Sequence, residues 1–199
     1  MPELLTALTT EHFTLATARS TAVSESSARS SLFLLSVSAT LVALGFVGQS
    51  AHDEMFEVFA LTVLPTLFAL GLVTFFRLTE SSIEDFRYAQ AINRIRRYYL
   101  KVAGEDAGYF LMSADDDRHG VWANMSVRPS VWHTFCTMPM AMALINSVIG
   151  GSLTALAIGI ATGAGLGIAV PCGGAVALIS LALHYAHTER EFRRLTGAP

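Results

Sequence analysis

The sequence predicts an all-α integral membrane protein with four transmembrane helices and cytosolic helical extensions. The chain has 199 residues, of which 52% are hydrophobic and only 15% charged, whereas a soluble domain carries about 25% charged residues. Four apolar stretches are long enough to cross a bilayer, which takes about 20 helical residues. The Lys and Arg residues are distributed between these stretches in a one-sided pattern.

The four predicted spans follow from runs of apolar residues. The first two are 32–48 and 56–76, and only Glu57 is charged in them. No Asp, Glu, Lys or Arg occurs in the 51 residues from Cys136 to Ala186, a run that is too long for one span and fits two. The Gly-rich stretch 159–167 is the predicted reversal. The third and fourth spans are therefore 138–158 and 168–186.

Basic residues set the predicted orientation, because Lys and Arg stay on the cytoplasmic side of a membrane. Of 13 such residues, two precede the first span, eight lie between the second and third spans, and three follow the fourth. Segment 1–31 is therefore predicted as a cytosolic N-terminal helix, 77–135 as a cytosolic helix and loop, and 187–199 as a cytosolic tail.

A seven-residue repeat of small and hydroxyl residues marks the N-terminal region. The repeat consists of Thr17, Ser24, Ser31, Ser38 and Gly45, preceded by Thr10. A single helix over about 4–48 would present them as one narrow seam, and such a repeat implies supercoiling against a partner helix. Helix packing and pore lining are the candidate roles of this seam. The alternative is that the hydroxyls bond carbonyls of their own helix and that the spacing is chance.

A second cytosolic helix is predicted over 81–104. Ser81 with Glu84, or Ser82 with Asp85, offers a capping box at its start. Gly104 is a suitable stop. The alternative is that the second span continues as one helix to about residue 102.

One face of this helix carries four cations. They are Arg87, Arg94, Arg97 and Lys101, which fall within about 80° of one another at 100° per residue. Arg96 points elsewhere. Three interpretations are open: topology together with attraction to anionic lipids, pairing with the acidic loop 113–120, or binding of a small anionic ligand. No Gly-rich phosphate loop supports the last interpretation.

Small residues recur every four positions in the third span. They include Ser147, Gly151 and Ala155. This pattern lets transmembrane helices touch closely, and pore lining is the alternative. Asn146 lies beside them and is expected to form a hydrogen bond across helices. Cys136 and Cys172 lie in apolar segments and are expected to be packing residues rather than a disulfide or metal pair.

The sequence contains no catalytic motif, and we expect no enzyme activity, cofactor or metal. A net charge of -3 argues against a nucleic-acid binder. The absence of a charge in the middle of any span argues against proton-coupled transport and voltage sensing. We therefore expect a homo-oligomer that contacts membrane lipids and forms a channel or pore. The alternative is a membrane-anchored sensor or scaffold, whose cytosolic helices bind a protein partner or a small anionic ligand.

Three segments together carry a resemblance to a known group of proteins. They are "TEHFTLATARSTAVSESSARSSLFL" at 10–34, "SSIEDFRYAQAINRIRRYYL" at 81–100 and "WANMSVRP" at 122–129. The combination resembles a family of small, uncharacterised, four-helix multi-pass membrane proteins of the actinobacterial type, which has no assigned activity. The resemblance implies a location in the bacterial cytoplasmic (inner) membrane. Independently of the resemblance, the distribution of Lys and Arg predicts that both termini lie in the cytoplasm.

Overall fold

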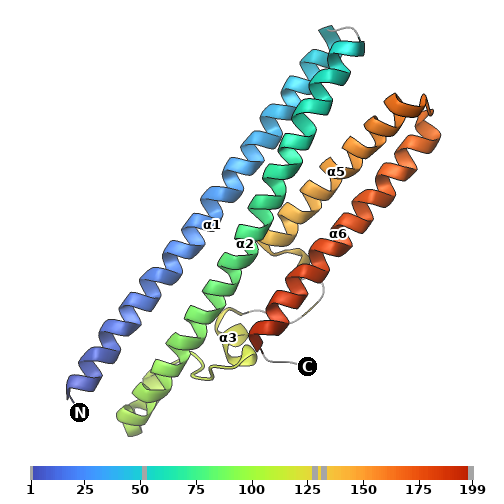
Figure 1. Ribbon diagram of the computed structural model, residues 1–199. Helices are drawn as coiled ribbons and strands as arrows, with labels where there is room; N and C mark the ends of the chain where they lie inside the picture. The colour runs from blue at the N-terminus through green and yellow to red at the C-terminus, as the bar shows by residue number, and fades with distance from the viewer. Residues whose placement is uncertain (1, 51–52, 127–129, 131–133, 197–199) are drawn as a thin grey trace. The chain divides into compact units, whose positions relative to one another are not determined.

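The computed structural model describes residues 2–50, 53–126, 130 and 134–196, and all the regular structure within them is helical (Figure 1). The chain divides into two compact units. The polar unit combines Met1–Ser26, Glu80–Phe135 and Glu191–Pro199, and the apolar unit combines Ser27–Thr79 and Cys136–Arg190. These divisions fall close to the ends of the four spans that the sequence predicts. Residues 127–129 and 131–133 of the predicted segment 77–135, and 197–199 of the predicted tail, lie outside the described residues.

Two long helices contribute to both units. Helix α1 comprises Pro2–Ser50 and α2 comprises Asp53–Ala103. The single helix over about 4–48 that the hydroxyl seam would require is therefore present. The predicted helix start at Ser81 is wrong, because Ser81 is buried within α2. The stretch "FFRLTE" before it contains neither Gly nor Pro, so nothing in the local sequence breaks the helix there. The alternative of a single helix to about residue 102 is the one that forms.

The remaining elements are shorter. They are the 3-10 helix η1 (Gly104–Tyr109) and the α-helices α3 (Arg118–Asn124), α5 (Met138–Thr162) and α6 (Leu166–Thr196). Gly104 and Gly163 have φ angles of 55° and 64°, in the left-handed region that glycine adopts without steric cost. The predicted stop after α2 and the predicted Gly-rich reversal between α5 and α6 are therefore both confirmed.

The interior of the apolar unit is filled by side chains from α1, α2 and α5. One cluster consists of Phe33, Leu67, Leu78, Met142 and Ile149. A second cluster consists of Phe75, Met140 and Ala143, with Leu181 and Tyr185 of α6 packed against it. Burial of apolar side chains therefore connects all four helices of this unit.

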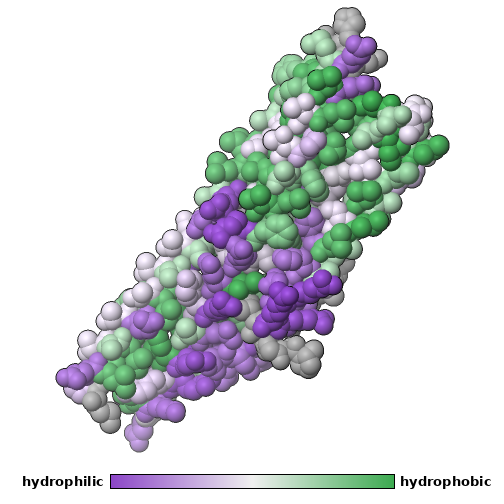
Figure 2. Space-filling model, viewed as in Figure 1, coloured by the Kyte–Doolittle hydropathy of each residue, from purple (hydrophilic) through white to green (hydrophobic). Residues whose placement is uncertain are grey.

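The outer surface of the apolar unit is also apolar. Large exposed side chains include Leu32, Phe46, Val58, Leu178 and Leu183, and apolar residues cover much of the visible face of these helices (Figure 2). A soluble protein rarely exposes a large contiguous apolar surface to water. Four helices are long and apolar enough to cross a membrane. These are the features of a membrane-embedded protein.

The polar unit has a small core of its own. Phe86, Ala89 and Val121 are buried together, with Trp122, Met125 and Phe192 packed around them. Arg19 of α1 reaches Asp85 of α2 through two hydrogen bonds of 2.7 and 3.3 Å. The two-point geometry of a guanidinium on a carboxylate fixes the register of these helices in the polar unit.

Candidate functional site

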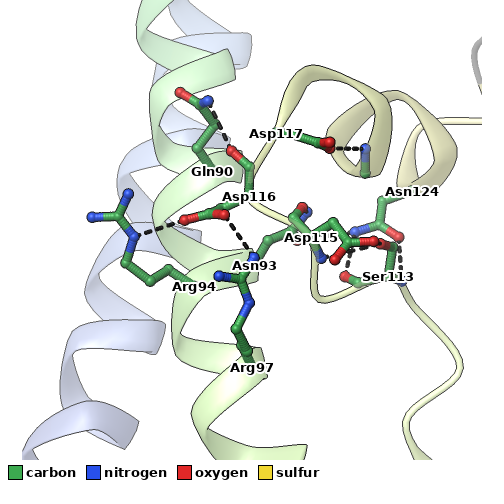
Figure 3. A network of polar contacts seen from close by, with 10 residues as sticks. Gln90, Asn93, Arg94, Arg97, Ser113, Asp115, Asp116, Asp117 and Asn124 are labelled. Carbon is green, nitrogen blue, oxygen red and sulfur yellow. Dashed lines mark hydrogen bonds and ion pairs between the residues drawn. The ribbon is translucent and has the colours of Figure 1, made fainter.

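An acidic loop is held against α2 by amide side chains that the helix presents on one face. Asn93 Nδ2 donates to the carbonyl oxygen of Asp115 at 2.7 Å, and Gln90 Nε2 donates to that of Asp116 at 2.9 Å. Asn93 is buried, and its Oδ1 accepts hydrogen bonds from Arg96 and Asn124. Figure 3 shows Gln90, Asn93 and Asn124 gathered around the loop. The backbone of the loop is therefore bonded in place and is not a freely solvated turn.

Local geometry at the end of the loop reinforces this attachment. Asp117 is the N-cap of α3, and its Oδ1 accepts a hydrogen bond from the backbone N–H of Gly120 at 2.7 Å. A side chain at position 120 would overlap the carbonyl group of Asp115. Glycine at this position lets the loop lie close against α3.

Two of the four predicted cations pair with the loop. Arg94 Nε lies 2.9 Å from Asp116 Oδ2, and Arg97 Nη2 lies 2.6 Å from Asp116 Oδ1 (Figure 3). These hydrogen bonds hold the pKa of Asp116 below its ordinary value. Of the three interpretations of the basic face, pairing with the acidic loop is the one that the geometry displays for these two residues.

The other two cations are not brought to this site. Arg87 and Lys101 are exposed and form no ion pair among the described residues. Exposed arginine and lysine side chains near a membrane are free to attract anionic headgroups, so that interpretation stays a prediction for this pair.

A polar cleft of about 490 Å³ lies between α1 and α2 within the polar unit. Its polar lining consists of His12, Arg19, Ser20 and Arg96. Arg96 Nη1 donates to Asn93 Oδ1 at 2.8 Å and to the carbonyl oxygen of Ser113 at 2.9 Å. This cleft was not predicted from the sequence. Its only signal was that Arg96 falls off the face shared by the other cations.

Among the described residues, the hydroxyl seam of α1 does not pack against another helix. Its members are all exposed: Thr17, Ser24, Ser31, Ser38 and Gly45. A side chain at position 45 would meet nothing within 4 Å. Ser31 Oγ donates to the carbonyl oxygen of Ser27 at 2.9 Å, as the alternative of bonding within the helix expects. The seam is therefore open to lipid or to a second molecule.

The small residues of α5 lie against α6. Ser147 Oγ donates to Ser180 Oγ at 3.1 Å. A side chain at Gly151 would meet Gly173 and Ala177, and one at Gly173 would meet Ala155. The backbones of α5 and α6 thus approach each other closely at these positions, as small residues in membrane helices allow.

Two expectations about the apolar helices are wrong. Asn146 is fully buried, yet its side-chain nitrogen and oxygen make no hydrogen bond among the described residues. It fits beside Gly71, which lacks the side chain that would overlap it, so the neighbouring helix provides space rather than a polar partner. Cys136 and Cys172 are exposed rather than packed, since neither faces the interior of the apolar unit.

Within the described part of the chain, no three His, Cys, Asp or Glu side chains gather as a metal site would require. No protein-family model, curated protein or solved structure matches the chain.

Proposed function

We propose that the protein is a membrane-anchored sensor or scaffold of the bacterial cytoplasmic membrane. In this proposal the apolar unit anchors the chain among lipids, and the polar unit works in the cytoplasm together with both termini. The one-sided distribution of Lys and Arg supports this orientation. The resemblance to small multi-pass bacterial proteins supports the choice of membrane.

The observation that carries the proposal is the fixed loop of the polar unit. The loop is bound directly by four side chains of α2, those of Gln90, Asn93, Arg94 and Arg97. A separate apolar core supports α3. A segment that only linked two spans would need neither feature, because loops without a packing role are usually mobile. The polar unit therefore has the defined surface that a binding module requires, whereas the apolar unit is filled by side chains.

The proposal is tested by topology and by ion flux. A cysteine label at Gly104 should react only after the cells are permeabilised, whereas a label at Gly163 should react from outside. The starting chain should have Cys136 and Cys172 replaced by Ser, so that only the introduced thiol reports. Liposomes containing the purified protein should leak ions no faster than empty ones. External labelling at Gly104, or clear ion flux, would contradict the anchoring role.

A second candidate function is a homo-oligomeric channel or pore. It is favoured by the exposed seam of α1, because a seven-residue repeat of small side chains suits contact with another helix. In this proposal a second copy of the chain packs on the seam, and the hydroxyl groups line either the contact or a central path.

A matched pair of variants tests this second candidate. Ser31 and Ser36 each donate to the carbonyl oxygen four residues earlier, both at 2.9 Å, but only Ser31 belongs to the seam. Ser31→Leu should dissociate the oligomer in mild detergent if the seam is a packed contact, while Ser36→Leu should not. An intact oligomer that loses ion flux would indicate a pore. Equal behaviour of both variants in both measurements would rule out a role of the seam.

A further inference from the structure

The polar cleft of the polar unit places three nitrogen-bearing side chains around one space. His12 and Arg19 extend from α1 and Arg96 extends from α2, while Ser20 adds a hydroxyl group. Ala16, Val23 and Ile92 complete the wall with apolar surface. A cleft of about 490 Å³ falls within the size range of small-molecule sites, in which a few polar groups set the specificity.

The charges in this cleft are not balanced. Arg19 is neutralised by Asp85 at 2.7 Å. Arg96 is half-buried, and its two hydrogen bonds go to neutral oxygen atoms of Asn93 and Ser113. Burial lowers the pKa of the Arg96 guanidinium, which reflects the cost of holding a cation away from water without a carboxylate partner. An anion in the cleft would offset that cost.

His12 is placed to respond to such an anion. Arg96 and Tyr99 of α2 face its ring, which lies 6.1 Å from that of Tyr99. Burial and the nearby Arg96 charge hold the pKa of His12 below its ordinary value. Its Nδ1 is buried without a hydrogen-bond partner among the described residues. A bound anion would counteract the charge of Arg96, raise the pKa of His12 and so favour the protonated ring.

We propose that this cleft binds a small, soluble, phosphate-bearing anion through Arg96, Ser20 and His12. The free edge of the Arg96 guanidinium suits two oxygen atoms of a phosphate group. The Ser20 hydroxyl and His12 can reach the remaining oxygens, and Ala16 and Ile92 can contact an apolar part of the ligand. This inference rests on the proposed sensor function, because it names the class of ligand that the polar unit would sense.

Position along α1 favours a soluble ligand over a lipid headgroup. Arg19 precedes the predicted span at residue 32 by 13 residues, or about 20 Å at the rise of an α-helix. The headgroup layer extends only about 5–8 Å beyond the hydrocarbon core on each side. A headgroup would therefore have to leave the bilayer to reach Arg96.

The test uses the full chain in nanodiscs of phosphatidylcholine with inorganic phosphate as the probe. Calorimetry should show saturable binding with a Kd of about 1–10 mM, and added phosphate should raise the pKa of His12. The His12 imidazole signal in NMR spectra is identified by its loss in His12→Gln. Absence of saturable binding would refute the proposal.

Matched variants then locate the site. Ala16→Glu places a carboxylate in the cleft without touching the loop contacts and should weaken phosphate binding about tenfold or more, a factor that corresponds to about 1.4 kcal/mol. Thr17→Glu adds the same charge on the adjacent, outward-facing residue and should change affinity less than about threefold. Arg96→Gln should abolish binding, whereas Arg94→Gln should not. Equal weakening by Ala16→Glu and Thr17→Glu would overturn the cleft as the site.

Nanodiscs that contain phosphatidylglycerol distinguish the two sources of phosphate. Unchanged affinity for inorganic phosphate supports a soluble ligand, whereas strong competition by the lipid would replace that assignment with a headgroup. Failure of this inference differs from failure of the proposed function. If phosphate does not bind while Gly104 is cytoplasmic and the liposomes do not leak ions, only the proposal of the cleft as a binding site is refuted. External labelling at Gly104 would refute the function regardless of binding.

Discussion

Substitution of two adjacent glycines of α6 by alanine tests how closely α5 and α6 pack. Gly173 is buried, and a methyl group there would lie 2.8 Å from the Cβ of Ala155 and against the carbonyl oxygen of Gly151. Gly174 is exposed, and a methyl group there would meet nothing within 4 Å. Gly173→Ala and Gly174→Ala thus add the same atom to neighbouring positions of one helix.

The expected difference follows from the separation of carbon atoms in a packed interior. Carbon atoms in contact lie about 3.5–4.0 Å apart, so Gly173→Ala must separate the two helices by about 1 Å. Overpacking of this kind typically costs about 1–3 kcal/mol. Both variants share the gain of about 0.5–1 kcal/mol that alanine brings to a helix interior. Gly173→Ala should therefore be less stable than Gly174→Ala by about 1–3 kcal/mol.

The measurement is the free energy of unfolding in mixed micelles, in which added SDS drives reversible denaturation. Helical circular dichroism in the absence of SDS provides the control that both variants fold. A difference below about 0.5 kcal/mol would show that α5 and α6 do not touch at Gly173, and the close packing of the small residues would have to be abandoned.

Three further predictions concern the polar unit. Asn93→Ala removes the donor to the Asp115 carbonyl and should lower the free energy of unfolding by about 1–3 kcal/mol. Hydrogen exchange across residues 113–117 should become faster, and unchanged exchange would mean that Asn93 does not hold the loop. The pKa of Asp116 is lowered from its ordinary value of 3.8, so its ion pairs should stabilise the loop above that pH and be lost as pH falls through the lowered pKa. Exchange in Asp116→Asn should lack this acid dependence. The pKa of His12 is lowered from 6.5 by burial and by Arg96, so the folded chain should lose stability as pH falls below about 6.5, and His12→Gln should lose less over the same range in thermal unfolding.

The helical architecture was largely predictable because it depends on local patterns. The apolar runs located four long helices, and the glycines at 104 and 163 marked the end of one helix and the reversal between two others. The predicted helix start at Ser81 was wrong, because a capping signal is less specific than an apolar run. A capping box satisfies N–H groups that a continuous helix already bonds, so the same residues occur inside helices without forming a start.

The candidate site was only partly predictable, because its geometry depends on contacts between distant segments. Helical periodicity placed Arg94 and Arg97 on one face, and the acidic loop was a visible partner. The cleft around Arg96 depends on the register between α1 and α2, which the pair of Arg19 and Asp85 fixes across 66 residues. No pattern within either helix reports that register. The same limit explains Asn146, whose surroundings depend on where Gly71 lies on the neighbouring helix.

Arg94 and Arg96 differ in exposure and in the partners they already have, and these two properties decide how well each could bind an anion. The Arg94 side chain is 77% exposed and already paired with Asp116, and such surface pairs contribute at most about 1 kcal/mol. An anion that approached Arg94 would have to compete with a carboxylate and with water. Arg96, two residues further along α2, is half-buried, and its hydrogen-bond partners among the described residues are neutral oxygens. An anion that reached Arg96 would compete with no carboxylate seen among the described residues, and it would offset the cost of holding this cation partly away from water. We therefore expect an anionic ligand to bind in the cleft rather than on the more densely charged exposed face of α2.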